Sequence, residues 1–207
     1  MHRVARMSLA LTVGGYLHAV SAFAQTPQEW LLCLSQDFSS PDLPIKGCTA
    51  IIQTGQQVID RLATAYNNRG VAYRLKAEYD KAIEDFNEAI RLRPRSPTIF
   101  NNRAVAYRKK GDLDHALADY NEAIRLNPNY IAALYNRGLL FDAKKEYERA
   151  IDDFNIALKI DPRNPFVLFR RGEAFLKKGS AGAGNADIAA AKAINPDIAE
   201  AIAREER

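Results

Sequence analysis

The sequence predicts an all-α protein, built as a solenoid in which antiparallel helix pairs stack on one another. Two observations lead to this prediction. The chain repeats itself with a period of 34 residues across residues 63–198, and within each period the apolar residues follow the spacing of amphipathic helices. One such unit cannot bury its own apolar face, so a stable protein requires several units packed against their neighbours.

Four segments align without gaps and define the repeating unit. They begin at Ala63, Pro97, Ile131 and Pro165. Six positions of the unit keep one class of residue: small at the eighth, aromatic at the eleventh and twenty-fourth, alanine at the twentieth and twenty-seventh, and proline at the thirty-second. In the first three units these residues are Gly70, Tyr73, Ala82, Phe86, Ala89 and Pro94; Ala104, Tyr107, Ala116, Tyr120, Ala123 and Pro128; and Gly138, Phe141, Ala150, Phe154, Ala157 and Pro162.

This pattern resembles the tetratricopeptide repeat family, which has the same residue classes at the same positions. The resemblance covers residues 63–198 and implies a right-handed superhelical solenoid with repeats at residues 63–96, 97–130, 131–164 and 165–198. The fourth repeat departs from the pattern, because Gly184 replaces the alanine and Ile188 replaces the aromatic residue. We therefore expect its second helix to be shorter or looser than the others.

The segments that flank the repeats are predicted to cap the solenoid. Residues 199–207 belong to a short amphipathic C-terminal capping helix, with Ile198 and Ile202 on its apolar face. Residues 25–62 are interpreted as a degenerate helical cap, in which residues 45–52 align with residues 83–90 of the first repeat. We expect a loop at residues 39–44 and a helix at residues 56–68 that leads into the first repeat.

Residues 1–24 have the layout of a secretory signal peptide. Arg3 and Arg6 form a positive start, residues 7–20 are mostly apolar, and Ala22-Phe23-Ala24 is a cleavage motif. The alternative is a membrane anchor, but a spanning helix needs about 20 apolar residues. We expect cleavage after Ala24 and an exported protein, either in a bacterial periplasm or secreted.

Export changes how the two cysteines are interpreted. Cys33 and Cys48 are the only cysteines in the chain, and an even number in an oxidising compartment indicates a disulfide. Two buried free thiols are the alternative. A disulfide here would pin the degenerate N-terminal cap.

Composition and motifs indicate a non-catalytic protein. The formal charge of +4 falls to +2 without Arg3 and Arg6, which is too small an excess to indicate nucleic-acid binding. After cleavage the only histidine is His115, so the chain offers no histidine pair for a metal and no Ser-His-Asp arrangement. We find no phosphate-binding or hydrolase motif, and we expect neither a cofactor nor enzymatic activity.

The resemblance places a peptide-binding groove on the first helices of the repeats. In this family that groove holds an extended peptide or a partner helix, so we expect a protein or peptide partner. The alternative is a structural accessory subunit of a cell-envelope complex, or a self-associating scaffold, whose groove is already occupied. The family's groove positions correspond here to Asn67, Asn68, Val71, Arg74, Asn101, Asn102, Val105, Arg108, Tyr135, Asn136, Leu139, Phe169 and Arg170.

Two polar series recur with the period, and each has two interpretations. The asparagines at the sixth position could bind the backbone of an extended peptide, as exposed residues outside the core, or could pack neighbouring helices. The arginines at the seventh position could form a basic stripe, or could pair with acids such as Glu84 or Asp85. These arginines are Arg69, Arg103, Arg137 and Arg171. The two-carboxylate clamp of some family members is not expected, because only Asn136 and Arg170 match its five positions.

Overall fold

The structure, a computed structural model, describes residues 27–35, 40–54 and 58–206. The predicted signal peptide lies outside these residues. Within them the chain forms eleven helices and no strand, which agrees with the all-α prediction. The helices are α1 (Pro27–Cys33), α2 (Asp42–Gln53), α3 (Ile59–Leu75), α4 (Tyr79–Leu92), α5 (Pro97–Lys110), α6 (Leu113–Leu126), α7 (Ile131–Ala143), α8 (Tyr147–Ile160), α9 (Pro165–Lys177), α10 (Ala181–Ile194) and α11 (Ile198–Glu206).

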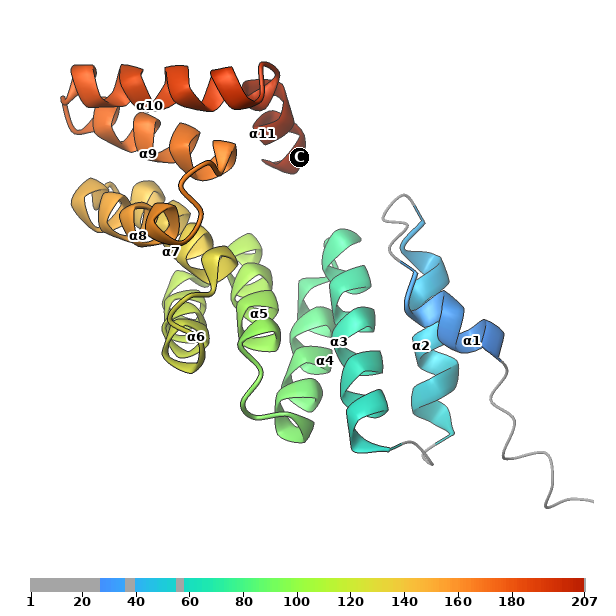
Figure 1. The fold of residues 1–207 in the computed structure, drawn as a ribbon. Helices are drawn as coiled ribbons and strands as arrows, with labels where there is room; N and C mark the ends of the chain where they lie inside the picture. Colours follow the sequence, from blue (N-terminus) through green and yellow to red (C-terminus); the bar gives the residue numbers. More distant parts are fainter. Residues whose placement is uncertain (1–26, 36–39, 55–57, 207) are drawn as a thin grey trace, which may run out of the picture.

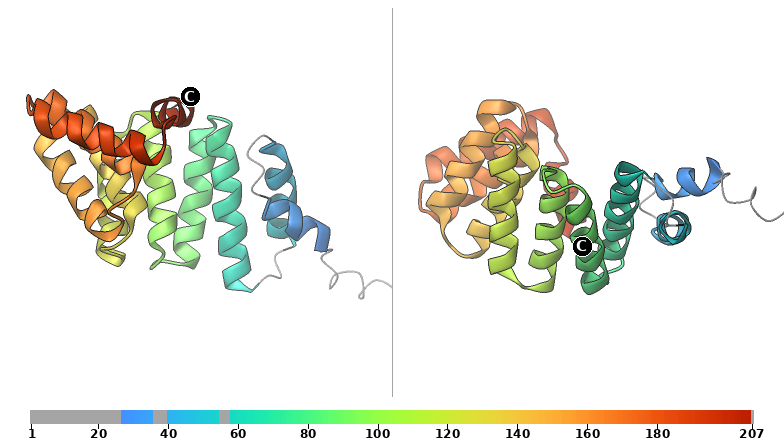
Figure 2. Two further views of the ribbon diagram at one scale, coloured as in Figure 1. Left: turned by 45° about the horizontal axis from the view of Figure 1, so that its top comes forward. Right: turned by 90° about the horizontal axis from the view of Figure 1, so that it is seen from below.

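The helices pack as consecutive antiparallel pairs along a curved stack (Figure 1). The direction of the pairs changes along the chain, so that α9 and α10 run at a steep angle to α3 and α4. Two further views show the same succession of pairs from other sides (Figure 2). The first helices α3, α5, α7 and α9 also contact one another in turn, so they form one continuous surface of the solenoid.

Small residues at the eighth position allow the two helices of a repeat to pack closely around an aromatic ring. A Cβ atom added at Gly70 would lie 2.8 Å from the ring of Phe86, and one added at Gly138 would lie 2.6 Å from the ring of Phe154. Both rings are completely buried. The pairing of a small residue with an aromatic residue sixteen positions later therefore fixes the distance between the two helices.

Each helix pair turns through a left-handed residue at its fifteenth position. These residues are Ala77, Gly111, Lys145 and Gly179, with φ between 58° and 92°. In each turn the next N–H donates to a carbonyl five residues earlier, as from Glu78 to Tyr73 at 2.9 Å. This is the Schellman ending of a helix, and it satisfies a carbonyl that the helix leaves open.

The arginines at the seventh position hold each helix pair together. Nε and Nη2 of each arginine donate to the two carboxylate oxygens of an aspartate sixteen residues later, at 2.6–2.8 Å. The aspartates are Asp85, Asp119, Asp153 and Asp187. Asp85 is nearly inaccessible, and burial raises its pKa although the Arg69 guanidinium acts in the opposite direction. The prediction that these arginines pair with acids is thus confirmed for Asp85, whereas Glu84 is not a partner of Arg69.

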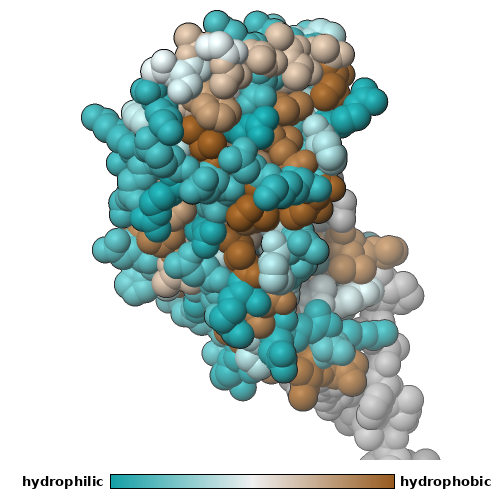
Figure 3. Space-filling view, turned by 60° about the vertical axis from the view of Figure 1, so that its left-hand side comes forward, coloured by the Kyte–Doolittle hydropathy of each residue, from teal (hydrophilic) through white to brown (hydrophobic). Residues whose placement is uncertain are grey.

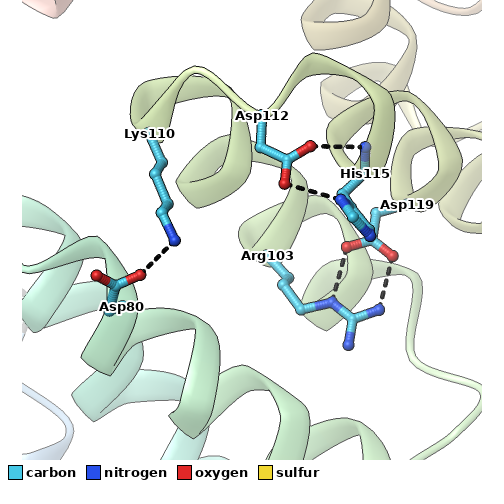
Figure 4. A network of polar contacts seen from close by, with 6 residues as sticks. All are labelled: Asp80, Arg103, Lys110, Asp112, His115 and Asp119. Atoms are coloured by element: carbon cyan, nitrogen blue, oxygen red, sulfur yellow. Dashed lines mark hydrogen bonds and ion pairs between the residues drawn. The ribbon is translucent and has the colours of Figure 1, made fainter.

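The same arginines also join each repeat to the one before it. Nη1 of Arg103 donates to Asn87, Nη1 of Arg137 to Asn121 and Nη1 of Arg171 to Asn155, at 2.7–2.8 Å. Arg69 makes the equivalent bond to Thr49 in α2. Figure 4 shows the Arg103–Asp119 pair, together with the ion pair between Lys110 and Asp80 of the preceding repeat.

The second helix of the fourth repeat is neither short nor loose, contrary to the expectation from sequence. Helix α10 has 14 residues, as have α4, α6 and α8. The reason is a close approach of two helix backbones. A Cβ atom added at Gly172 would lie 2.9 Å from the carbonyl oxygen of Gly184, and one added at Gly184 would lie 2.8 Å from that of Gly172. Ile188 takes the place of the aromatic ring, since its Cγ1 would lie 2.8 Å from the Cβ atom added at Gly172, and the close backbone approach accompanies this contact.

The N-terminal region is helical, with two differences from the prediction. Helix α2 begins at Asp42, so Pro44 lies in its first turn and not in a loop; a proline is tolerated there because the first N–H groups of a helix have no partner. The helix predicted at residues 56–68 continues without interruption to Leu75 as α3. A disulfide joins Cys33 to Cys48, and both cysteines are completely buried.

The last helix covers the end of the stack. Ile198 and Ile202 of α11 are buried, and α11 packs against α9. None of the helices in the described part of the chain has the length and apolar character needed to cross a membrane.

Candidate peptide-binding groove

A hollow of about 570 Å³ opens on the surface formed by the first helices. Helices α5 and α7 supply most of its lining, and α3 and α9 contribute one arginine each. The lining residues are Arg74, Asn101, Asn102, Val105, Arg108, Lys109, Tyr135, Asn136, Leu139, Asp142, Ala143 and Arg170. We call this hollow the groove.

Most of the residues predicted for the groove line it. The four that do not are Asn67, Asn68, Val71 and Phe169. Val71 and Phe169 pack against the core, and Asn68 donates to the carbonyl oxygen of Cys33 at 3.1 Å. The groove is therefore centred on the second and third repeats, and it does not extend over the first helix of the N-terminal repeat as far as the sequence predicted.

Figure 3 shows the side on which α6 and α8 lie in Figure 1. Hydrophilic side chains dominate that face, and hydrophobic ones show between them only in a narrow, interrupted band. The top of the view is pale brown because the alanine-rich helix α10 lies there.

The asparagines join neighbouring first helices. The side-chain amide of Asn102 donates to Asn67 at 2.9 Å, and that of Asn136 donates to Asn101 at 3.0 Å. Asn101 is only 6% exposed. The expectation that these residues are exposed and outside the packing is therefore wrong, because each bond spans two repeats.

The asparagines still offer polar groups to the groove. Asn102 and Asn136 both line it and are half-buried. Each of the bonds above uses one N–H of the donating amide, and an amide side chain has a second N–H and an accepting oxygen as well. Packing and ligand binding are therefore compatible at these positions.

The groove carries a positive charge that is only partly balanced. Its lining contains four basic residues and one acid, Asp142, which accepts from Lys177 at 2.5 Å. Arg170 pairs with Glu173 at 2.9 Å. Arg74 and Arg108 form no ion pair with any described residue, and burial lowers the pKa of Arg74, as does the charge of Arg108. The charge of the groove favours an anionic ligand.

The model of the tetratricopeptide repeat matches residues 63–96, 97–130 and 131–164. The chain belongs to the tetratricopeptide repeat family. Proteins of this family are typically interaction modules without catalytic activity. No curated protein matches the chain.

Solved tetratricopeptide proteins have the same fold. One structure of MamA is 20% identical, with a TM-score of 0.66 over 78% of this chain and 92% of that chain. YrrB, a TPR protein with an unusual peptide-binding site, is 19% identical, with a TM-score of 0.63 over 87% of this chain and 91% of that chain. BtubC from P. vanneervenii is 20% identical, with a TM-score of 0.66 over 79% of this chain and 75% of that chain. At this identity the likeness shows the fold alone, and it confirms the predicted fold class.

The described part of this tetratricopeptide protein holds no cluster of three His, Cys, Asp or Glu residues that could bind a metal ion. His115 is exposed and bonds Asp112 through Nδ1 at 2.8 Å (Figure 4). Its ring also stacks on that of Tyr107. Its backbone N–H also donates a hydrogen bond to the Asp112 carboxylate, so Asp112 is the N-cap of α6. Asp112 and His115 therefore act together at the start of a helix.

Proposed function

We propose that this tetratricopeptide protein is a protein-interaction scaffold that binds an extended segment of a partner protein in its groove. The observation that carries the proposal is the composition of the groove. The apolar side chains of Val105 and Leu139 line it together with the side-chain amides of Asn102 and Asn136. Apolar contacts would hold side chains of the segment, and the amides would pair its backbone groups.

The spacing of the first helices fits an extended chain. Packed helices lie about 8–10 Å apart, and an extended peptide advances about 3.3 Å per residue. Roughly every third residue of the segment would therefore meet a new repeat. YrrB, a tetratricopeptide protein of similar fold, also has a peptide-binding site.

A neutral substitution of one apolar groove residue tests the proposal. We expect Leu139→Asn to weaken binding of peptides selected from a random dodecapeptide library by about tenfold, because it removes apolar contact area without changing charge. Binding is measured by fluorescence anisotropy, and circular dichroism checks folding. Ile156→Asn is the matched control, since Ile156 is 40% exposed on α8 and lies outside the groove.

The competing proposal, a groove occupied by the chain itself, predicts a different result. No residue of α11 lines the groove, so the described C-terminal helix does not fill it. A second copy seated in the groove would make the protein dimeric, and Leu139→Asn would then lower the dimer fraction in sedimentation velocity. A library that yields no binding peptide for a dimeric protein would favour that structural role.

We also propose that the protein is exported and that its mature chain begins at Gln25. The cleavage motif before Gln25 and the buried Cys33–Cys48 disulfide support this location. We further propose that residues 25–62 and 199–207 cap four repeats. The intact mass of the protein from the periplasm should correspond to residues 25–207 with two hydrogen atoms fewer, and a mass that includes residues 1–24 would contradict export with cleavage.

A further inference from the structure

We propose that Arg74 and Arg108, supported by the neighbouring Tyr120 hydroxyl, form a binding site for one carboxylate of the partner segment. This inference rests on the proposed function and specifies the chemistry of the ligand. Arg74 and Arg108 lie on α3 and α5 and line the same end of the groove. Tyr120 lies on α6 in the core and does not line the groove, but its hydroxyl is close enough to both arginines to be affected by their charges.

Three hydrogen-bond donors at this place have no acceptor among the described residues. They are Nε of Arg74, Nε of Arg108 and the hydroxyl of Tyr120, and all three are buried. Tyr120 as a whole is 0% exposed. A buried donor without an acceptor is unfavourable, and a buried guanidinium without an anion is more so.

The three groups lie close enough to influence one another electrostatically. Burial raises the pKa of Tyr120, whereas the charge of Arg108, a side-chain hydrogen bond with Arg108 and the charge of Arg74 lower it. Arg108 also lowers the pKa of Arg74, after the larger effect of burial. One carboxylate would relieve the repulsion between the two guanidinium groups and would accept from both, since a carboxylate has two oxygens and accepts several hydrogen bonds.

The repeats also differ in sequence at the positions of these three residues. The twelfth position holds Arg74 and Arg108 in the first two repeats but Asp142 and Leu176 in the others. The twenty-fourth position is Phe86 and Phe154 in the first and third repeats, and only the second has a hydroxyl, in Tyr120. By contrast, all four arginines of the seventh position have a carboxylate partner within the chain. The twelfth-position arginines of the first two repeats have no carboxylate partner among the described residues.

Small carboxylates test the site directly. The Nε–H resonances of Arg74 and Arg108 are assigned in ¹⁵N-labelled protein from their loss in R74Q and R108Q. We expect them to shift saturably on titration with N-acetylglutamate N-methylamide, which carries a side-chain carboxylate, or with N-acetylalanine, which carries a main-chain carboxylate. The probe that binds more tightly identifies an acidic side chain or a chain terminus as the source. The neutral N-acetylglutamine N-methylamide should produce no shift.

Variants give the second measurement. R74Q and R108Q should each lower the affinity for the tighter-binding probe by about tenfold, as expected for the loss of a hydrogen bond to a charged group. R95Q removes the same charge from an exposed residue outside the groove and should have little effect. Tyr120→Phe should lower the affinity for the probe severalfold. It should not lower stability, because phenylalanine occupies the same position in two other repeats.

Each outcome has one meaning. Any of three results would overturn the proposed carboxylate site. These are equal resonance shifts with the neutral amide, unchanged probe affinity in R74Q and R108Q, and binding of inorganic phosphate but of neither carboxylate. Selected peptides that bind the arginine variants as tightly as wild type would overturn the site and leave the proposed groove intact. A positive carboxylate titration with no selected peptide would reject the proposed function and leave the carboxylate site.

Discussion

Two non-glycine residues, Ala77 and Lys145, adopt left-handed backbone conformations in the turns between paired helices. Their φ angles are 58° and 63°, whereas the equivalent turns of the second and fourth repeats use glycine. A Cβ atom disfavours this conformation. The Schellman hydrogen bond is formed in all four turns, so the remaining turn geometry maintains the strained residues.

Glycine should therefore stabilise the protein at either position. We expect Ala77→Gly and Lys145→Gly each to raise the free energy of unfolding by about 1 kcal/mol, measured by urea denaturation. Gly111→Ala is the matched control and should lower it by a similar amount, since Gly111 has a φ of 92° and an added Cβ atom would meet no neighbour. An unchanged or lower stability in Ala77→Gly would contradict the argument.

The helix pair is held by one buried ion pair at its seventh and twenty-third positions. Asp119 is 6% exposed, and both of its oxygens accept from Arg103 at 2.7 Å. Each arginine also lies over the aromatic ring four residues later, as Arg103 lies 5.9 Å from the ring of Tyr107. Such a pair is costly to break, because the partner that remains is buried with its charge uncompensated.

Arg103→Ala should therefore lower the free energy of unfolding by about 3–5 kcal/mol. The double variant Arg103→Met/Asp119→Leu should recover most of this loss, because neither charge then remains. Thermal unfolding followed by circular dichroism measures both. Arg91→Ala serves as the control, since Arg91 and Glu88 form an exposed pair that contributes about 0–1 kcal/mol. A loss of that small size in Arg103→Ala would show that the pair is dispensable.

In the whole molecule, the disulfide acts on one end of a solenoid whose units contact only their neighbours. Closing the loop between Cys33 and Cys48 restricts the unfolded chain by about 3 kcal/mol in the entropy model. Cys33→Ala/Cys48→Ala should therefore destabilise the protein by about 2–4 kcal/mol. Hydrogen exchange should accelerate in α1, α2 and α3 and should change little in α9 and α10. Equal acceleration along the chain would contradict nearest-neighbour stability.

The sequence predicted the repeats well because each recurring residue class has one packing task. The small residues, the aromatic rings and the paired arginines all have partners at a fixed separation in the chain. The prediction was wrong for α10 because Ile188 packs against Gly172 in place of the aromatic ring, and because the backbones at Gly172 and Gly184 approach closely, which side-chain patterns do not reveal. It was wrong about the exposure of Asn102 and Asn136, because each bonds a residue that lies 35 positions earlier in the chain. A recurring asparagine is equally compatible with an exposed surface and with a hydrogen bond between repeats.

The groove was predicted only in part for the same reason. Family positions named most of its lining. The sequence placed Tyr120 in the core, which the structure confirms, but gave it no part in a carboxylate site. The signal that could have identified it is its hydroxyl, which the equivalent residues Phe86 and Phe154 lack.

The bonds between arginines and the preceding repeat give the array a polarity. Every arginine reaches backward, to an asparagine at the twenty-fifth position of the repeat before it or, at the N-terminal end, to Thr49. A duplicated second repeat would carry Arg103, Asp119 and Asn121 together, so each added copy would supply the acceptor for its successor. In the fourth repeat the twenty-fifth position is Ala189, which offers no side-chain acceptor. A further unit would therefore dock on the fourth repeat without this bond, and restoring asparagine at position 189 would supply the missing acceptor.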